Sequence, residues 1–490
     1  MSENFNNHPS LTNWELVSTH PKQKNWTWKT LFNFWANNIQ TVIGFSLIVS
    51  LYLAYNLNGL TVFVGTILAG FIVVWMTNLS GKPCQKMGIP FPVFLRMTMG
   101  VYGARYAAIL RGLVAIFMFG TQTFFISKSV GFLIRITIFS FDENLMSKEI
   151  FNQFFLELGL IDWSSLIITA IIQYYLFTSN IKTIKNIINF SGISVYLSML
   201  FFVYIVYSKI EVDLLNSFHS IFKFDEALNI QNAIPLITVF GTMFAYFSII
   251  IVNFGDYSKH LKNETELEIG NYSLLLNIIL FSSMAVFITL GTDIFFNKQL
   301  INLERVLTNP TDIVAQLDQT NITIAVLIFV IISSVGTNLI ANYIPSSYSL
   351  INFMPSKLSV KSSGLIISVL GFFIGGIWVS IISQIGLLSI VDTVAAFFGP
   401  IFGVIIVDYY FVKKQAYNPK DLFSSDPNGE YYFSGGWSLK AFYAIFIAFI
   451  FSAATIWNEN FRFLQSYAWF IGAFMGGLLQ YLLSKKKFIF

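Results

Sequence analysis

Several polar residues interrupt a hydrophobic segment that is long enough to cross a membrane. The segment covers residues 321–345, and its second half reads IISSVGTNLIANY. A helix turns by about 100° per residue, so Ser333, Ser334, Thr337, Asn338 and Asn342 share one half of its circumference. Polar groups are costly against lipid, and this face is therefore predicted to line a cavity or a ligand. The alternative is a network of hydrogen bonds between neighbouring helices.

Three carboxamides in different hydrophobic segments indicate what such a cavity would bind. They are Gln40 in the first segment, Gln122 in the third and Asn342 in the eighth. A carboxamide presents an acceptor beside a donor, which complements a ring –NH–C(=O)– edge. Together they predict a planar, neutral, hydrogen-bonding solute. Met118 lies one turn before Gln122 on the same face. Phe247 could stack on a planar ring, although packing in the core is the simpler explanation for it.

Ionisable side chains inside these segments are few, and none is given a catalytic role. Arg111 lies near the start of the third segment, where its long side chain can reach the membrane surface. Lys128 follows Gln122 by six residues, about 240° round the helix, so it is expected to point toward the outer surface. Asp256 ends the sixth segment close to Lys259, where we expect a surface ion pair.

The composition places these residues in a membrane protein. Of the 490 residues, 55% are hydrophobic and only 11% are charged, against about a quarter charged in soluble domains. About 20 apolar residues cross a bilayer as a helix. The chain contains twelve such spans, at residues 31–56, 58–78, 105–131, 163–179, 186–208, 233–255, 270–293, 321–345, 363–386, 389–411, 440–457 and 463–484.

The predicted fold class is an all-α polytopic membrane protein with twelve transmembrane helices. We expect a cytoplasmic N-terminal tail over residues 1–30, a transmembrane domain over 31–484 and a cytoplasmic C-terminal tail over 485–490. Twenty lysines and arginines fall on the segments assigned to the cytoplasm and seven on the opposite side, which supports both termini inside the cell membrane. The net charge of +4 then reflects topology, and no nucleic-acid partner is expected.

Enzymatic chemistry finds little support in the residue types. The single cysteine, Cys84, and four scattered histidines offer neither a disulfide nor a zinc site. An enzyme at membrane depth would need paired carboxylates, a metal cluster or an activated nucleophile, and the sequence offers none. We therefore expect no enzyme and no cofactor other than a coupling ion, and a monomer whose partners are the lipid bilayer and a small neutral heterocycle.

The first and sixth spans are interrupted at similar depth. FWANNIQTVIGF places amides before Gly44, and VFGTMFAYFSIIIVNFGDY places Gly241 near its start and Asn253 near its end. Interrupted spans in corresponding positions, five apart, are typical of an inverted-repeat transporter with its site near the midplane. Small residues alone would fit tight helix contacts equally well, whereas clustered amides favour a site.

Five stretches resemble the nucleobase:cation symporter-1 family, which includes hydantoin, allantoin and uracil permeases. The most specific is GIPFPVFLRMTMGVYGA at residues 88–104, which is close to the family's GIPFPVxxRxxxGxxGA. RGLVAIFMFGTQTFF at 111–125 is similar to RALVAxxWFGxQTW, and NFGDYSKHLK at 253–262 to N-x-x-D-[FY]-[ST]-R. FFGPIFGVIIVDYYFVKKQAYNPKDLF at 397–423 resembles GPxxGVxxxDYxxVRRxxYxxxDLY, and NWELVSTHPKQKNW at 13–26 keeps the register of N-x-D-L-x-P…R-x-W.

The resemblance implies a leucine-transporter-like fold, in which spans one to five and six to ten form inverted repeats and two helices follow. It also implies that Gln40, Gln122 and Asn342 contact the substrate and that Phe247 takes the place of an aromatic residue in span six. Met118 falls where the family has a Trp that stacks on the substrate ring. A thioether can pack against a planar ring, but affinity or substrate range is expected to differ.

A sodium site is implied as well, built from two hydroxyls of the eighth span and from three backbone carbonyls, those of Ala36, Ile39 and Ser333. The two hydroxyl positions hold Gly336 and Thr337 here. Sodium thus loses one hard-oxygen ligand unless Ser334 or a water replaces it. Proton coupling becomes at least as good an expectation, and the coupling ion is left as Na⁺ or H⁺.

Together these features predict a cation symporter that imports a nucleobase or a related cyclic ureide, of uracil, allantoin or hydantoin type, by alternating access. An amino-acid permease of the same broad fold would need a glycine motif at the first break to grip a carboxylate and an ammonium group, whereas ANNIQT offers amides. A non-transporting membrane receptor is the remaining alternative.

Overall fold

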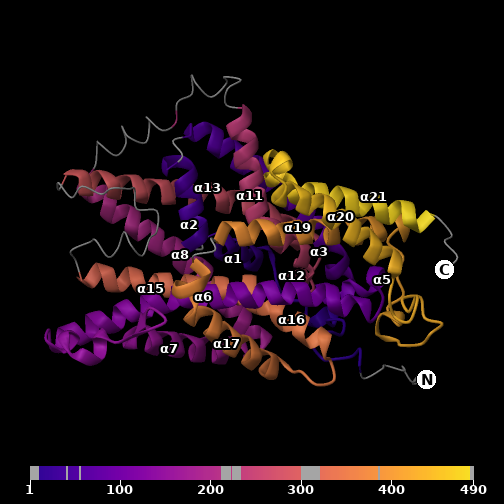
Figure 1. Ribbon diagram of the computed structural model, residues 1–490, viewed down its shortest axis with the longest axis horizontal. Helices are drawn as coiled ribbons and strands as arrows, with labels where there is room; N and C mark the ends of the chain where they lie inside the picture. The colour runs from indigo at the N-terminus through magenta and orange to yellow at the C-terminus, as the bar shows by residue number, and fades with distance from the viewer. Residues whose placement is uncertain are drawn as a thin grey trace.

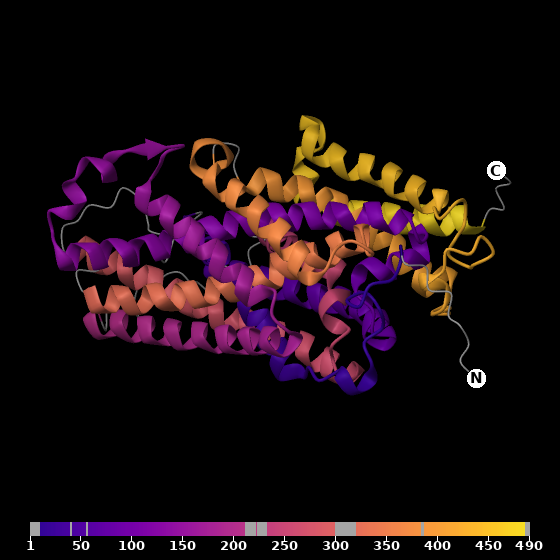
Figure 2. The same ribbon diagram turned by 90° about the horizontal axis from the view of Figure 1, so that it is seen from below.

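Helices make up most of the computed structural model, which describes residues 10–39, 42–54, 57–210, 222, 233–298, 320–383 and 387–485. They run as an elongated bundle, and both termini lie at the same end of it (Figures 1 and 2). Two termini on one side are what an even number of membrane crossings requires.

The first half of the chain supplies the helices that correspond to spans one to five. They are α1 (Trp28–Ile39), α2 (Val42–Val49), α3 (Gly59–Met87), α6 (Gly103–Phe141), α7 (Leu160–Phe177) and α8 (Ile181–Ile210). Shorter elements lie between them: η1 (Pro21–Gln23), π-helical η2 (Ser50–Ala54), α4 (Phe91–Phe94), α5 (Arg96–Met99), η3 (Leu145–Ser147), η4 (Glu149–Asn152) and an antiparallel hairpin of β1 (Phe154–Phe155) and β2 (Leu158–Gly159).

The second half supplies spans six to twelve. The main helices are α11 (Ala233–Asn253), α13 (Glu264–Lys298), α15 (Thr320–Thr337), α16 (Ile344–Phe353), α17 (Val360–Gly376), α19 (Leu387–Val407), α20 (Leu439–Trp457) and α21 (Ala468–Lys485). Shorter elements are α12 (Gly255–Ser258), the π-helical η6 (Asn338–Tyr343), η7 (Trp378–Ile382) and η8 (Asp408–Val412), and the 3₁₀ elements η9 (Asp421–Phe423) and η10 (Glu459–Tyr467). The last two long helices, α20 and α21, lie side by side on one flank of the bundle (Figures 1 and 2).

Each of the twelve expected spans overlaps helical structure in the described part of the chain. Within the described part of the chain, nine helices are long and apolar enough to cross a membrane on their own. In the first span the structure describes α1 up to Ile39 and α2 from Val42 onward. Asn37 and Asn38 donate side-chain hydrogen bonds to the carbonyls of Asn33 and Phe34, four residues back. Such back-bonding competes with the helical ladder and is found where helices bend or end.

The eighth span is divided by a π-helical turn, an irregularity that often marks a functional site. Its cause can be read from Pro345 at the start of α16. Proline has no N–H and excludes the carbonyl four residues earlier, here that of Ala341. The N–H of Ile344 bonds to Leu339 instead of Ile340. Two carbonyls of η6, at residues 340 and 341, are therefore left to accept bonds from other helices.

Close helix contacts hold α1 in place. A β-carbon on Gly192 of α8 would lie 2.8 Å from the Asn33 β-carbon, and one on Gly270 of α13 would lie 2.5 Å from Leu31. Glycine at these two positions thus lets α8 and α13 approach α1 closely. Nine of the 12 residues of α1 are buried, so this helix forms part of the core of the bundle.

Residues 10–27 pack against the bundle, although the sequence assigned them to a polar tail. Leu11 and Leu16 are fully buried, and Arg96 donates from Nη1 to the Leu11 carbonyl over 2.9 Å. Trp26 forms a parallel bridge with Leu261. The apolar residues within this otherwise polar segment explain the difference.

Candidate functional site

The polar half of the eighth span lies inside the bundle. Its five polar side chains are each at most 8% exposed, and the segment packs against α1, α6 and α8. They are Ser333, Ser334, Thr337, Asn338 and Asn342. Both roles predicted for this face, a lining for a ligand and an internal network, require such burial, and the hydrogen bonds distinguish them.

Asn338 is the centre of an internal network that joins three helices. Its Nδ2 donates to Thr123 Oγ1 on α6 over 3.1 Å and to Gln173 Oε1 on α7 over 3.1 Å. Asn342 Nδ2 donates in turn to Asn338 Oδ1 over 2.9 Å. The bond fixes the Asn342 carboxamide so that its Oδ1 remains as the acceptor. Sequence reasoning missed Gln173, whose only signal was a lone amide inside the fourth span.

Gln122 is a further buried amide of this region, and its nitrogen, like that of Gln173, has no partner among the described residues. The side chain is 3% exposed, and Nε2 makes no hydrogen bond with any described residue. It precedes Thr123, a member of the Asn338 network, along α6. Buried donors without a partner are rare and each calls for an explanation. A ligand carbonyl would supply the missing acceptor.

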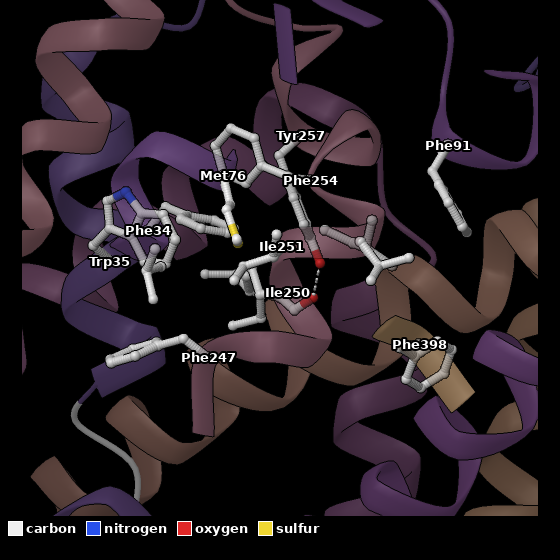
Figure 3. Packing of buried hydrophobic residues seen from close by; sticks show 14 of the residues in the cluster. Phe34, Trp35, Met76, Phe91, Phe247, Ile250, Ile251, Phe254, Tyr257 and Phe398 are labelled. Carbon is white, nitrogen blue, oxygen red and sulfur yellow. Dashed lines mark hydrogen bonds between the residues drawn. The ribbon is translucent and has the colours of Figure 1, made fainter. Parts of the chain in front are cut away.

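The two apolar residues proposed for the site differ in exposure. Met118 is partly exposed, one turn before Gln122 on α6. Phe247 on α11 is fully buried, with its ring edge-on to Trp35 at 6.3 Å and to Tyr246 at 5.0 Å. Figure 3 shows it at the edge of an aromatic cluster that includes Phe34 and Trp35. The described contacts of Phe247 are therefore packing contacts.

The last described residues of α1 are bonded to the sixth and eighth spans. The interruption expected in the sixth span near Gly241 is wrong, because α11 runs continuously from Ala233 to Asn253. Thr337 Oγ1 donates to the Asn37 carbonyl over 2.6 Å, and Tyr246 donates from its hydroxyl to the Asn38 carbonyl over 2.8 Å. Ala36 and Ile39, whose backbone carbonyls are expected to bind sodium, are also buried. Gln40, the third expected amide, lies outside the described residues.

Arg111 does not reach the membrane surface as the sequence suggested. It is 1% exposed, donates from Nε to Asn253 Oδ1 over 2.9 Å and from Nη2 to the Ala341 carbonyl over 3.1 Å. Tyr257 donates to the neighbouring Ile340 carbonyl over 2.6 Å. The two carbonyls of η6 that Pro345 leaves without helical partners are thus both satisfied from other spans.

The prediction of a surface ion pair at Asp256 is also wrong. Asp256 is 1% exposed, and its carboxylate accepts bonds from the Phe91 N–H at 2.9 Å and from Asn253 Nδ2 at 3.2 Å. Lys259 instead donates to the Glu15 carbonyl over 3.0 Å. The packed N-terminal segment covers this region, which sequence spacing did not reveal. Lys128 is exposed on α6, as expected.

A multi-spanning bundle with an irregular turn in its eighth span beside a buried and incompletely bonded polar centre is typical of secondary transporters. The comparisons with known proteins agree. A family model for permeases of cytosine and purines, uracil, thiamine and allantoin matches residues 19–484. The chain belongs to this family, the nucleobase:cation symporter-1 transporters, and it is a multi-pass membrane permease and not an enzyme.

Relatives in plants and bacteria match along most of the chain. The purine-uracil permease NCS1 of Arabidopsis thaliana is 25% identical over 452 residues, which cover 89% of this chain and 70% of that protein. The allantoin permease of Bacillus subtilis is 23% identical over 481 residues, which cover 97% and 93%. The solved structure of Mhp1, a nucleobase-cation-symport-1 family transporter in a closed conformation with bromovinylhydantoin bound, superposes with a TM-score of 0.72 at 18% identity and covers 97% of this chain and 96% of that chain. This likeness confirms the leucine-transporter-like fold.

Proposed function

We propose that the protein is a symporter that imports a nucleobase or a related cyclic ureide across the cytoplasmic membrane. The observation that carries the proposal is the buried Gln122 amide, whose Nε2 lacks an acceptor. A charged substrate would need an opposite charge in the site, whereas a ring carbonyl satisfies a neutral donor. The names of the relatives point the same way, because uracil, allantoin and hydantoins all carry ring carbonyls beside N–H groups.

In this proposal the two amides bind opposite partners of one ring edge. Gln122 donates to a ring carbonyl, and Asn342 Oδ1 accepts from the adjacent ring N–H, since its own Nδ2 is held by Asn338. Gln40 serves as a further amide, while Met118 and Phe247 cover the ring faces. A donor and an acceptor placed in this way select for a lactam or imide edge.

Transport is proposed to be coupled to Na⁺ or H⁺ and to proceed by alternating access, without covalent chemistry. The cation would bind the carbonyls of Ala36, Ile39 and Ser333 and the hydroxyl of Thr337. The bond from Thr337 to α1 supports this arrangement, since it already joins the helices that would share the ion. A rocking motion that separates α1 from α15 would then release ion and substrate together.

The test is uptake of radiolabelled solutes into proteoliposomes that contain the purified full-length protein. The panel consists of uracil, cytosine, allantoin, hydantoin, adenine and an amino acid, L-leucine, under separate sodium and proton gradients. We expect gradient-driven uptake of at least one heterocycle and none of leucine. Uptake of leucine alone would favour an amino-acid permease, and binding without uptake would favour a receptor.

We also propose that both termini lie in the cytoplasm and that the protein works as a monomer. The chain has one cysteine, which is buried, so single cysteines introduced at exposed positions report topology. In intact cells, a membrane-impermeant maleimide should label Glu459→Cys in η10 and leave Lys22→Cys in η1 unlabelled. Labelling in the reverse pattern would invert the proposed orientation.

A further inference from the structure

Two adjacent phenylalanines lie exposed on the short hairpin between α6 and α7. In this hairpin Phe154 pairs with Gly159 and Phe155 with Leu158. Phe154 is 68% exposed and Phe155 67%, whereas Leu158 is buried in a small apolar cluster with residues of α6 and η7. In Figure 2 the hairpin lies on the flank of the bundle, at the end opposite the termini. It is thus packed against the protein on one side, and its uncovered apolar side chains mark an interaction surface.

The length of α7 places this hairpin at the edge of the membrane. α7 has 18 residues, a length of about 27 Å, which nearly equals the thickness of the hydrocarbon core at about 30 Å. Its outward side is apolar, with Ile171 52% exposed. The loop after its last turn leads to Lys185, which donates to the Asn25 carbonyl of the N-terminal segment over 2.8 Å. Leu160, the first residue of α7, therefore lies at the opposite edge of the core, and the hairpin directly precedes it.

The side chains that hold the hairpin are of types found at that edge. Arg135 on α6 and Asp162 on α7 form a partly exposed ion pair at 2.6 Å, and such charges avoid the centre of a bilayer. Asp162 also accepts a bond from the Gly159 N–H over 3.1 Å. Trp163 donates from Nε1 to the Phe155 carbonyl over 3.2 Å, and tryptophan is enriched where membrane and water meet. These bonds fix the hairpin level with the first turn of α7.

Charged and apolar residues are separated along the same connection. Its first part, next to η3 and η4, carries four exposed charged residues, Asp142, Glu143, Lys148 and Glu149. The hairpin that follows has one charged residue, Glu157, at its turn. Segments that lie in a membrane surface have this division, with aromatic side chains at the boundary between headgroups and acyl chains and charged side chains in water.

We propose that the hairpin, residues 154–159, anchors this end of α6 and α7 in the bilayer. Phe154 and Phe155 insert at the headgroup boundary of the leaflet opposite the termini. A lipid surface is the occupant that fits, because the phenylalanines continue the apolar outward side of α7 and lie at the level of Trp163 and the Arg135 ion pair. The anchor does not depend on which solute is transported.

The test attaches the fluorophore NBD to single introduced cysteines of the full-length protein, since Cys84 is buried. The protein is placed in vesicles of phosphatidylcholine and phosphatidylglycerol, with iodide on both sides as the aqueous quencher. A label at Phe155→Cys should emit at shorter wavelength, lose its quenching by iodide and be quenched by a lipid that carries a nitroxide near its headgroup. Glu143→Cys, exposed in the same connection, is the matched control and should show the opposite pattern. Ile171→Cys supplies the reference for a label among acyl chains.

The alternatives give different results. Quenching by iodide at position 155 that is as strong as at position 143 would place the hairpin in water and overturn the proposal. Protection from iodide without quenching by the nitroxide lipid would mean that protein covers the phenylalanines. Protection that disappears when the protein-to-lipid ratio is lowered would identify a second copy of the chain as the cover. If Phe155→Cys does not fold, Phe154→Cys replaces it.

Discussion

The π-helical turn η6 is bonded differently on its two sides. On one side, Arg111 and Tyr257 donate to the carbonyls of Ala341 and Ile340, which Pro345 leaves without helical partners. On the other side, Asn342 completes a bond to Asn338, while Gln122 nearby on α6 keeps an unpaired donor. The same irregular turn therefore joins a fully bonded region to an incompletely bonded one.

The difference indicates which region serves structure and which serves binding. A buried polar network whose donors and acceptors are paired makes a helix geometry rigid. A buried donor without a partner costs stability unless a ligand satisfies it. We therefore interpret the Arg111 side as the support that positions η6, and the Gln122 side as the surface that meets the substrate. Five substitutions, two of them with a matched control, test this comparison.

Arg111→Met is expected to have the largest effect, and on stability. It removes a charged donor from two buried acceptors, Asn253 Oδ1 and the Ala341 carbonyl. Bonds to charged groups contribute roughly 1.5–3 kcal/mol each, so the loss of two should be about 3–6 kcal/mol. Thermal unfolding in detergent should show a large drop in melting temperature, or no folded protein.

The matched control is Arg135→Met on the same helix. Arg135 forms a partly exposed ion pair with Asp162 at 2.6 Å, and such pairs contribute about 0–1 kcal/mol. Its melting temperature should stay close to that of the wild type. Equal and small effects at both arginines would mean that the Arg111 network does not support η6.

Gln122→Ala is expected to weaken substrate binding without lowering stability, the opposite of Arg111→Met. The substitution removes an unpaired buried donor, so the melting temperature without substrate should be unchanged or slightly higher. Substrate affinity should fall by about fivefold or more, since a hydrogen bond between binding partners contributes of the order of 1 kcal/mol or more. Asn342→Ala should likewise lose binding. Undiminished affinity in both variants, measured by equilibrium binding of the transported heterocycle, would show that the amide assignment is wrong.

Tyr257→Phe should have a smaller effect, and we expect it to lower both stability and substrate affinity. It removes the hydroxyl that bonds to the Ile340 carbonyl and should cost about 1 kcal/mol of stability. Because η6 carries Asn342, a loss of support should also weaken substrate binding a few-fold. Tyr410→Phe is the control, since Tyr410 bonds to the Leu79 carbonyl over 3.0 Å, away from η6. A comparable stability loss without weaker binding is expected for Tyr410→Phe.

The sequence predicted the positions of the spans and of their polar residues better than it predicted the hydrogen-bond partners of these residues. Apolar runs located the spans because hydrophobic length sets a membrane crossing, and helical periodicity placed Asn338 and Asn342 on one face. The burial of Arg111 could not be predicted from its own segment. Its acceptors are Asn253 Oδ1 on α11 and the Ala341 carbonyl on η6. The second is available only because Pro345 leaves this carbonyl without a helical partner. Likewise, Gly336 read from the sequence as a missing ligand, and only the structure shows Asn37 and Ser191 beside it.

Met118→Trp should have the smallest effect and refines the binding side. Met118 is partly exposed next to the unpaired Gln122 donor, so a larger ring at this position should meet the substrate without breaking any buried bond. A flat indole stacks on a planar heterocycle better than a flexible thioether. Affinity for the transported ring should therefore be retained or rise a few-fold, with no change in melting temperature. Loss of binding in a stable Met118→Trp protein would place the substrate directly against the methionine and show that the pocket is shaped differently from that of relatives with tryptophan.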